Sequence, residues 1–298
     1  MSVLSAPHFH NEEAAYAYVE ARLWPQGPVC PHCGGVERIS KMGGKSTRIG
    51  AYKCYQCRKP FTVKLGTIFE ASHVPMRHWL QVMFLIASSK KGVSANQVHR
   101  SLGCTLKTAW FICHRIREAM RSGDLAPFGG EGGIVEVDET FIGREPGKEV
   151  KRAFHHKMKV LTLGDRTTGQ ARSVVIDDLK PSTIGPIVAA NMAREATLMT
   201  DEAKVYSPIG KDYAAHGIVN HSHGEYVSAL DPQVHTNTVE GYYSVFKHGM
   251  KGAYQHCGKK HLHRYMAEFD FRYNHLIALG VDDQGARTSR FNAWLGGA

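Results

Sequence analysis

The chain has 298 residues, enough to bury a substantial core and to form two or three structural units. Its 43% hydrophobic and 21% charged residues are ordinary for a globular protein, while lysine plus arginine outnumber the acids by 37 to 27. The resulting formal charge of +10 favours a polyanionic partner such as nucleic acid, although a merely soluble basic protein has the same balance.

The sequence predicts neither a membrane protein nor a secreted protein. The longest apolar run, residues 79–87, is too short to span a bilayer, and the N-terminal residues have neither the basic nor the apolar region of a secretory signal. We therefore expect a cytoplasmic protein with no membrane partner. Its seven cysteines are then not expected to form a disulfide framework.

The N-terminal segment, 1–27, is predicted to form a helix over residues 12–24, where apolar residues recur at helical spacing before Pro25. The following segment, 28–72, carries the strongest local pattern in the chain. It contains two Cys-x2-Cys pairs separated by 20 residues, namely Cys30, Cys33, Cys54 and Cys57.

Four thiolates at this spacing suit a tetrahedral zinc site of the ribbon type, with short strands expected over 48–54 and 59–65. The metal would supply most of the folding free energy of so small a unit. A redox or disulfide pair is the alternative interpretation of the cysteines.

Residues 73–122 show a helical pattern. A buried helix is expected over 76–89, followed by two helices that open at Ser94 and Thr105 and are divided at Gly103, which is the layout of a helix-turn-helix. An ordinary helical hairpin is the alternative. The residues expected near the polar face of the second helix, where DNA would bind, are Lys107, His114, Arg115 and Arg117, whereas Trp110, Ile112, Cys113 and Ile116 are expected in the core.

A Gly-rich linker over 123–133 is expected to lead into a catalytic domain at 134–280 and a C-terminal tail at 281–298. The pattern predicts strands at 134–143, 159–165 and 171–178, a helix at 182–193, strands at 196–203 and 216–222, and a helix at 235–249. This order predicts an α/β fold of the ribonuclease-H-like type, a mixed five-stranded sheet flanked by helices.

Three acids fall at positions suited to a shared site. Asp138 ends the first predicted strand, Asp201 ends the fourth, and Glu240 lies on the closing helix. Carboxylates brought together repel one another unless cations lie between them, and oxygen ligands select Mg²⁺ or Mn²⁺. Two such ions can activate a water molecule or a 3′-hydroxyl and stabilise the leaving oxygen of a phosphodiester.

Each acid also has a simpler interpretation. Asp138, like Glu136 on the same strand face, could be an exposed charge on an edge strand, and Asp201 could serve a turn. Glu240 could be the third residue of a capping box opened by Asn237. Further acids that could act as ligands are Asp177, Asp178 and Glu202.

The helix at 235–249 offers Glu240 a partner. Lys247 follows Glu240 by nearly two turns and therefore lies on the same face, about 10 Å further along, where it could hold a DNA backbone or remain solvated. A separate apolar stripe is expected to anchor this helix and consists of Val239, Tyr242, Phe246 and Met250.

Several motifs together carry a resemblance to a known family, with matching order and spacing: CPHCGG, YKCYQCRKPFTV, GTIFEASHVP, VDETFIG, MTDEAKVY, HTNTVEGYYSVFKHGMKGAYQH and AEFDFRYNH. From about residue 12 to about 278 the chain resembles bacterial insertion-sequence transposases of the DDE class that carry an N-terminal zinc ribbon.

The resemblance implies a catalytic triad of Asp138, Asp201 and Glu240, with Lys247 as the associated lysine. It also implies Mg²⁺ as cofactor, double-stranded DNA at the element ends and in the target as partner, and a nucleoid-associated enzyme. The implied reaction is nicking at the element end followed by attack of the freed 3′-hydroxyl on target DNA. We also expect Lys251 to contact DNA, and we expect at least a homodimer when the protein is assembled on DNA.

Two other functions remain open from the sequence. A DNA-binding regulator, or a domesticated inactive transposase, would use the ribbon and the helix-turn-helix without cutting DNA. A tyrosine recombinase is suggested by His261, Arg264 and Tyr273, but Tyr273 continues an apolar stripe on its helix and is expected to be buried.

Overall fold

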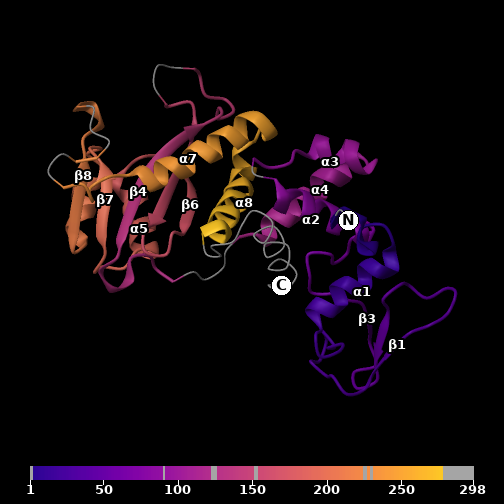
Figure 1. Cartoon of the computed structure of the whole chain (residues 1–298). Coiled ribbons are helices and arrows are strands. Elements are labelled where there is room, and N and C mark those ends of the chain that lie inside the picture. The colour runs from indigo at the N-terminus through magenta and orange to yellow at the C-terminus, as the bar shows by residue number, and fades with distance from the viewer. Residues whose placement is uncertain are drawn as a thin grey trace. The chain divides into compact units, whose positions relative to one another are not determined.

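The computed structural model describes residues 3–89, 91–121, 126–150, 154–223, 227–228 and 231–277. The chain divides into two compact units, one ending at Ala119 and the other beginning at Met120, each with its own hydrophobic core (Figure 1). No described helix combines the length and the apolar character needed to cross a lipid bilayer. The predicted tail at 281–298 lies outside the described residues.

The first unit begins with helix α1 (Glu12–Leu23), which follows short 3₁₀ turns η1 (Val3–Ser5) and η2 (Pro7–Phe9). The Glu12 carboxylate accepts hydrogen bonds from the backbone nitrogens of Met76 (2.6 Å) and Arg77 (3.2 Å), at the start of α2 (Met76–Ser88). It thereby satisfies amides at a helix end that have no partner within the helix. The N-terminal helix is therefore an integral part of this unit.

The ribbon part of this unit contains little regular structure. Its strands, within the described residues, are β1 (Ile39–Lys41), β2 (Tyr52–Cys54) and β3 (Pro60–Phe61), antiparallel and in that order. Strands β2 and β3 are shorter than the sequence predicts. Their core consists of Cys30, Cys54 and Phe61 with the half-buried Trp24 against them, which is too small to hold the segment together without another interaction.

The predicted helix pair is present as α3 (Ala95–Leu102) and α4 (Leu106–Ala119). Ser94 accepts a hydrogen bond from the nitrogen of Gln97 (3.2 Å), and Thr105 accepts one from the nitrogen of Thr108 (3.1 Å). Both predicted N-caps are thus confirmed. Gly103, at φ +65°, ends α3 in the left-handed conformation that glycine adopts without strain.

The second unit is built on one large sheet, formed in the described part of the chain by five strands. They are β4 (Ile134–Ile142), β5 (Met158–Asp165), β6 (Ala171–Ile176), β7 (Thr197–Asp201) and β8 (Ala215–Val219). Their spatial order is β6-β5-β4-β7-β8, with β4–β5 and β5–β6 antiparallel and β4–β7 and β7–β8 parallel. The predicted ribonuclease-H-like fold is confirmed.

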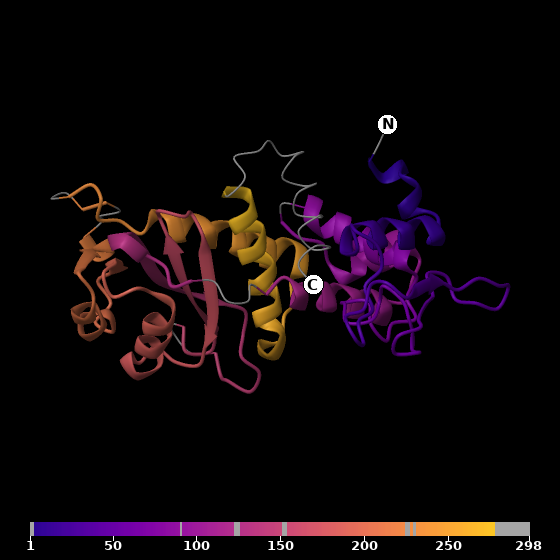
Figure 2. The same cartoon turned by 90° about the horizontal axis from the view of Figure 1, so that it is seen from below.

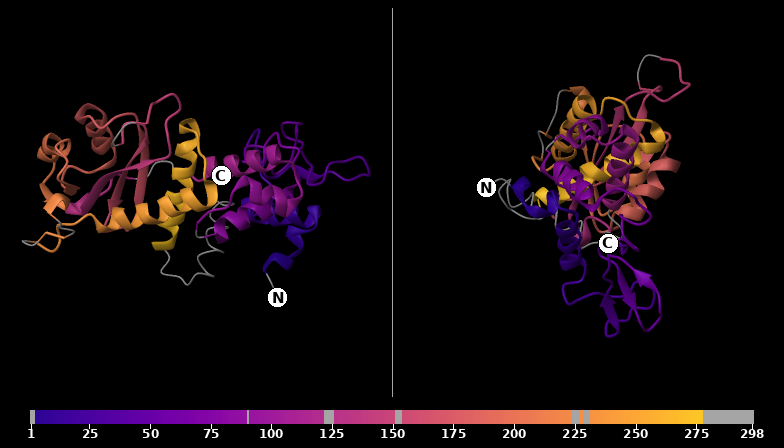
Figure 3. Two further views of the ribbon diagram at one scale, coloured as in Figure 1. Left: turned by 90° about the horizontal axis from the view of Figure 1, so that it is seen from above. Right: turned by 90° about the vertical axis from the view of Figure 1, so that its right-hand side faces the viewer.

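Helices cover both faces of this sheet (Figures 1 and 2). The elements that flank it are α5 (Pro181–Asn191), α6 (Tyr206–Ile209), α7 (Asn237–Gly249) and α8 (Lys259–Ile277), with short turns η3 (Gly130–Gly132), η4 (Gly210–Asp212), η5 (His221–His223) and the π-helical η6 (Met250–Tyr254). Seen from above, α7 lies on one side of the strands and α5 on the other (Figure 3).

The two cores follow from the alternation of side chains along the strands. Leu161 and Leu163 of β5 face α5 and α6, whereas Met158 and Val160 face α7 and α8. Every residue of β5 is buried, as expected for a strand covered on both faces. The predicted apolar stripe of α7 is confirmed, since all four of its members are buried.

Part of the predicted linker belongs to this unit instead. Within 123–133, Phe128 is buried in the core shared with α5 and forms a parallel bridge with Met192. The backbone nitrogen of Gly129 donates to the Asp165 carboxylate (3.1 Å). The glycines suggested a flexible connection, but Gly129 adopts φ +74° in a tight turn against the sheet.

Candidate metal and nucleic-acid sites

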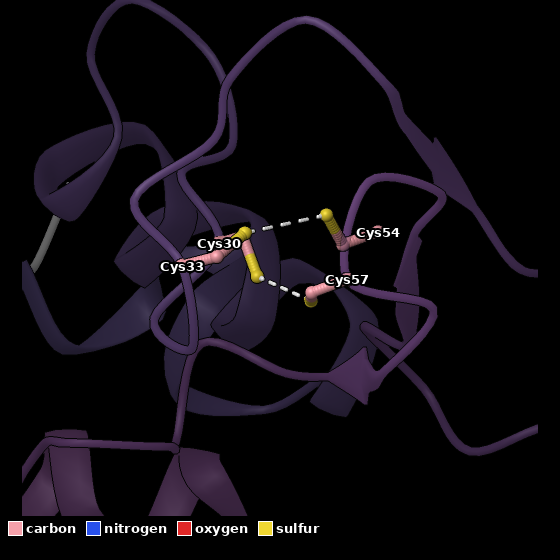
Figure 4. Close-up of side chains that lie close together, drawn as sticks. All are labelled: Cys30, Cys33, Cys54 and Cys57. Carbon is pink, nitrogen blue, oxygen red and sulfur yellow. Dashed lines mark hydrogen bonds between the residues drawn. The ribbon is translucent and has the colours of Figure 1, made fainter.

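The four cysteines of the ribbon turn toward one point (Figure 4). All their Sγ atoms lie within 4.8 Å of one another, and the Cys30–Cys57 and Cys33–Cys54 Sγ distances are 3.6 and 3.7 Å. Sulfurs around zinc at about 2.3 Å form a tetrahedron with edges of about 3.8 Å, whereas a disulfide requires about 2.05 Å. The donor set fits structural zinc, and the disulfide alternative is wrong for these cysteines.

Asp138 lies on the central strand β4, opposite Thr162 of β5, and is half-buried. The expectation that Glu136 could be an exposed charge on an edge strand is wrong. Its side chain is completely buried, because β4 is flanked by β5 and β7 and covered by α7 on that face.

Asp201 ends β7, which runs parallel to β4 and next to it. The prediction that Asp138 ends its strand is wrong, because β4 continues to Ile142. Asp138 and Asp201 nevertheless lie at the same level of the sheet, since each comes two residues after the register pair Glu136–Met199. One Asp201 oxygen accepts a hydrogen bond from the nitrogen of Ala203 (3.0 Å), which fixes the carboxyl at the start of the following turn.

Glu240 lies in the first turns of α7, but not in a capping box opened by Asn237. The helix begins at Asn237 with Thr236 as N-cap, so Glu240 is its fourth residue. The Thr236 hydroxyl donates to a Glu240 oxygen (3.2 Å), and the Nε2 atom of His221 lies 3.3 Å from the same oxygen.

Two contacts that flank Glu240 bind α7 to β4. The nitrogen of Val239 donates to the buried Glu136 carboxylate (3.0 Å), and the Tyr243 hydroxyl donates to the carbonyl oxygen of Asp138 (2.6 Å). Glu240 is therefore held on the stretch of helix that lies along the part of the strand carrying Asp138.

The charges in this region are crowded. Burial and the neighbouring charges of Glu139, Asp201 and Glu240 raise the pKa of the Asp138 carboxyl to about 8. Burial also raises the pKa of Asp201, and Glu202 acts in the same direction. A cation bound among these oxygens would offset both the burial of the charged carboxylates and their mutual repulsion.

The carboxylates nevertheless do not form a closed cluster. Within the described residues, the cysteines are the only group of three or more histidine, cysteine or acidic side chains whose ligand atoms all lie within 4.8 Å. A site for two metal ions needs no such closeness. When the two metal ions lie about 4 Å apart, ligands on their opposite sides can lie about 8 Å from each other. The oxygen-only donors and their uncompensated charge fit Mg²⁺ or Mn²⁺.

Two side chains near the acids were not selected from the sequence. Glu139 accepts a hydrogen bond from the Tyr206 hydroxyl (2.5 Å), and burial together with Asp201 raises its pKa. His221 approaches Glu240 from η5, whose first two backbone nitrogens donate to Glu202. Glu139 adjoins Asp138 in the sequence and could have been included on that ground, whereas no pattern singles out His221.

The other acids considered as ligands have different partners. Asp177 is paired with Lys259 (2.6 Å), at the start of α8. Asp178 accepts hydrogen bonds from the Thr183 hydroxyl (2.6 Å) and the nitrogen of Lys180 (3.1 Å). Glu202 binds the backbone of η5 and thus shapes the neighbourhood of His221.

The predicted polar face of α4 is partly wrong. His114 and Arg117 are 3% and 1% exposed, and Arg117 donates to the carbonyl of Val93 (3.3 Å), whereas Trp110 is 42% exposed. Apolar periodicity locates the centre of a buried face but not its width, and here that face extends over both basic residues. His114 is accordingly not available for DNA contact, while Lys107 is exposed and Arg115 half-exposed.

The two basic residues of the second unit that were predicted to contact DNA are accessible. Lys247 is half-exposed with its Nζ atom 5.7 Å from the centre of the Tyr243 ring, and Lys251 is exposed on η6. By contrast, Tyr273 packs edge-on against Tyr242 at 5.3 Å between ring centres, and burial raises its pKa. This position gives no support to a nucleophilic tyrosine.

These features define a zinc-ribbon protein with a ribonuclease-H-like domain that carries Asp138 and Asp201 on adjacent strands and Glu240 on the helix packed against them. Residues 131–274 match the ISXO2-like transposase domain, and residues 10–60 match the transposase zinc-ribbon domain. An uncharacterized protein in the transposable element ISH50 of Halobacterium salinarum is 27% identical over 281 residues, or 89% of this chain and 91% of the relative.

The chain therefore belongs to the insertion-sequence transposases with an N-terminal zinc ribbon. It is a DNA transposase, and its family implies polynucleotidyl transferase activity. The resemblance inferred from the sequence motifs is confirmed.

Two solved structures show weak similarity. A chain of the simian T-cell lymphotropic virus intasome in complex with PP2A regulatory subunit B56 gamma is 12% identical, with 64% of this chain and 65% of that chain covered and a TM-score of 0.30. The Drosophila P element transposase strand transfer complex gives 8% identity, 78% and 66% coverage, and the same TM-score. This chain thus spans slightly less than two thirds of each, and the fold assignment stands on the strand order.

Proposed function

We propose that this transposase cuts DNA at the ends of its insertion sequence and joins the freed ends to target DNA, with Asp138, Asp201 and Glu240 as the metal-binding catalytic residues. The observation that carries the proposal is the position of Asp138, where burial, together with the neighbouring acids Glu139, Asp201 and Glu240, raises the pKa of its carboxyl to about 8. A fold that buries several acids close together favours bound cations.

Bound there, Mg²⁺ or Mn²⁺ would activate the attacking oxygen and stabilise the leaving oxygen. In the first step a water oxygen attacks phosphorus at the element end, and the bond to the 3′ oxygen breaks to leave a 3′-hydroxyl and a 5′-phosphate. In the second step that 3′ oxygen attacks a target phosphorus, and the displaced target strand leaves with its own 3′-hydroxyl. One phosphodiester replaces another, so no covalent protein–DNA intermediate is required.

The residues of the chain have separate parts in this scheme. Asp138 and Asp201 would hold the ions from adjacent strands, and Glu240 would contribute a ligand from α7, where Thr236 and His221 orient its carboxylate. Lys247 and Lys251 bind the DNA backbone beyond the site, and Lys107 and Arg115 contribute contacts from α4. Because two element ends must be joined to one target, the working form is at least a dimer, acting on bacterial DNA at the nucleoid.

The test uses purified full-length protein and labelled oligonucleotide duplexes that carry the element ends. Asp138→Asn, Asp201→Asn and Glu240→Gln should each reduce metal-dependent strand cleavage by at least about 1,000-fold while end binding changes little. Asp212→Asn and Glu195→Gln, at exposed positions in the same unit, serve as controls and should cleave normally. Cleavage by a triple variant of the three acids would refute the assignment, and binding without any cleavage by the unmodified protein would favour a regulator or an inactive copy.

A further inference from the structure

A buried ion pair lies beneath the N-terminal end of α7. Glu136 of β4 has no exposed side-chain surface, and its Oε1 atom accepts a hydrogen bond from Nε of Arg166 at 2.6 Å. Arg166 follows directly after β5, and its side chain is 16% exposed. Burial removes water from both charges, and the attraction between them only roughly offsets this desolvation penalty. A contribution to stability is therefore a weak explanation for the pair.

The rest of the Arg166 guanidinium binds the segment that leads into α7. Its Nη1 atom donates to the carbonyl oxygen of Gln233 (2.6 Å), and its Nη2 atom donates to the carbonyl oxygen (2.6 Å) and Nδ1 (2.8 Å) of His235. Every nitrogen of the group is thus engaged, in directions that a planar guanidinium provides and a lysine ammonium does not.

The second oxygen of Glu136 continues this connection into the helix. It accepts the hydrogen bond from the nitrogen of Val239, one of the first amides of α7, which have no partner within the helix. Thr236, the N-cap residue, supplies no side-chain cap. A carboxylate from the strand therefore caps α7 at the residue immediately before Glu240.

The neighbouring strand leaves room for this close approach. Gly164 of β5 is the register partner of Glu136. A Cβ atom on Gly164 would lie 2.8 Å from Cγ2 of Val239, so any larger residue would push α7 away from the sheet. The absent side chain and the ion pair are independent features that fix the same point of the helix.

We infer that Arg166 and Glu136 are positioning residues that hold Glu240 beside Asp138 and thereby set the affinity of the carboxylate site for divalent ions. The inference rests on the proposed function, because it assumes that these acids bind the ions. Residues that orient metal ligands through hydrogen bonds typically change metal affinity by about 10-fold to 100-fold when they are replaced.

The primary test compares Arg166→Lys with Arg194→Lys in full-length, zinc-loaded protein. Arg194 is an exposed arginine of the same unit that pairs with Asp212, so the two variants carry the same chemical change. Mn²⁺ binding is measured by electron paramagnetic resonance of the free ion, and thermal unfolding is recorded without added Mn²⁺. Arg166→Lys should weaken Mn²⁺ binding at least about 10-fold, whereas Arg194→Lys should leave it unchanged.

A positioning role also predicts a specific kinetic pattern. DNA cleavage by Arg166→Lys should require a higher Mn²⁺ concentration and should recover when that concentration is raised, whereas cleavage by Asp138→Asn should not recover.

Glu136→Gln provides a second variant, because glutamine has nearly the same shape as glutamate. It should also weaken Mn²⁺ binding, and amide exchange should show faster opening of the first turn of α7.

The outcomes separate the inference from the proposed function. If Asp138→Asn loses Mn²⁺ binding while both Arg166→Lys and Glu136→Gln fold and bind it normally, only the positioning role is overturned. If Asp138→Asn binds Mn²⁺ as well as the unmodified protein does, the carboxylate site itself is refuted, and the positioning inference with it.

Discussion

The four cysteines of this transposase are already arranged as a metal site, whereas the three carboxylates Asp138, Asp201 and Glu240 are not. The four sulfurs already lie at the separations of a zinc tetrahedron, whereas no three acids in the described residues approach one another so closely. The cysteines come from two short turns, each with two ligands three positions apart. The acids come from β4, β7 and α7, and together they span about a hundred residues of the sequence.

This difference is the one expected between a structural zinc site and the catalytic metal site proposed for the carboxylates. A structural site encloses its ion with protein ligands, while a catalytic site leaves positions for water and substrate. In the ribbon, the core is too small to replace the metal. At the carboxylates, the sheet and α7 provide the stability, and the acids are held together against their own repulsion.

The largest effect should follow from removing a zinc ligand. Cys54→Ser should abolish zinc binding and unfold the ribbon around residues 28–72, because binding of structural zinc contributes on the order of 10 kcal/mol to the folding of such units. Zinc content per chain and amide exchange of the ribbon measure the result. Cys104→Ser, a half-buried cysteine outside the cluster, is the control. A ribbon that stays protected without zinc would contradict this prediction.

The opposite effect on stability is expected at the proposed catalytic acids. Without divalent ions, Asp138→Asn should raise the free energy of unfolding by at least about 1 kcal/mol, because it removes one of several crowded charges. The pKa of Asp138, about 8, lies above its unfolded value, so the stability of the unmodified protein falls as the pH rises toward 8. The gain from asparagine should therefore be greatest above pH 8.

Thermal unfolding with and without Mg²⁺ checks this prediction. Mg²⁺ should raise the melting temperature of the unmodified protein more than that of Asp138→Asn, because only the former keeps the full ligand set. Asp212→Asn, at an exposed position, should behave like the unmodified protein. A lower melting temperature for Asp138→Asn in the absence of Mg²⁺ would show that the acid is not held under repulsion.

Features encoded locally could be predicted from the sequence. The cysteine spacing, the caps at Ser94 and Thr105, and the succession of strands and helices along the chain are all set by neighbouring residues, and the structure agrees with each. The width of the buried face of α4 depends on what packs against it, so the burial of His114 could not be read from periodicity.

The candidate site was predictable only in part for the same reason. The placement of Asp138 and Asp201 on separate strands follows from the succession of strands along the chain, but the partners of Glu240 do not. Thr236 and His221 meet it through the path of the chain between β8 and α7, and Glu136 reaches α7 only because β4 is central. Such contacts join segments far apart in sequence and have no local signature.

A smaller effect is expected at Lys247. Replacing this residue tests whether the face of α7 that carries Glu240 binds DNA. Lys247→Ala should weaken binding to element-end duplexes by up to about 10-fold and reduce the slope of log affinity against log salt by about 1, because one phosphate contact is lost. Lys211→Ala, at an exposed position in the same unit, is the control. An unchanged salt slope would place Lys247 outside the DNA interface. Fluorescence anisotropy over a salt series measures both quantities.

The smallest effect is expected at Glu145, whose negative charge is balanced by lysine side chains of the protein and not by a metal ion. The buried Glu145, on the β4–β5 connection, forms ion pairs with Lys148 and Lys259. The hydrogen bond from Lys148, followed by that from Lys259, lowers the pKa of its carboxyl to about 2. Since the folded pKa lies below the unfolded value of about 4.3, the stabilisation is present above that value and is lost as the pH falls toward 2.

Glu145→Gln should therefore cost about 1 kcal/mol of unfolding free energy at neutral pH, after allowance for solvent screening of the lysines, and nothing near pH 2. Urea unfolding over a pH series gives the difference, with the exposed Glu149→Gln as control. A constant difference across the series would mean that packing and not charge is responsible. Glu145 and Asp138 should then show opposite pH dependences: an acid matched by lysines loses its contribution in acid, whereas an acid crowded by other acids becomes less costly there because it takes up a proton.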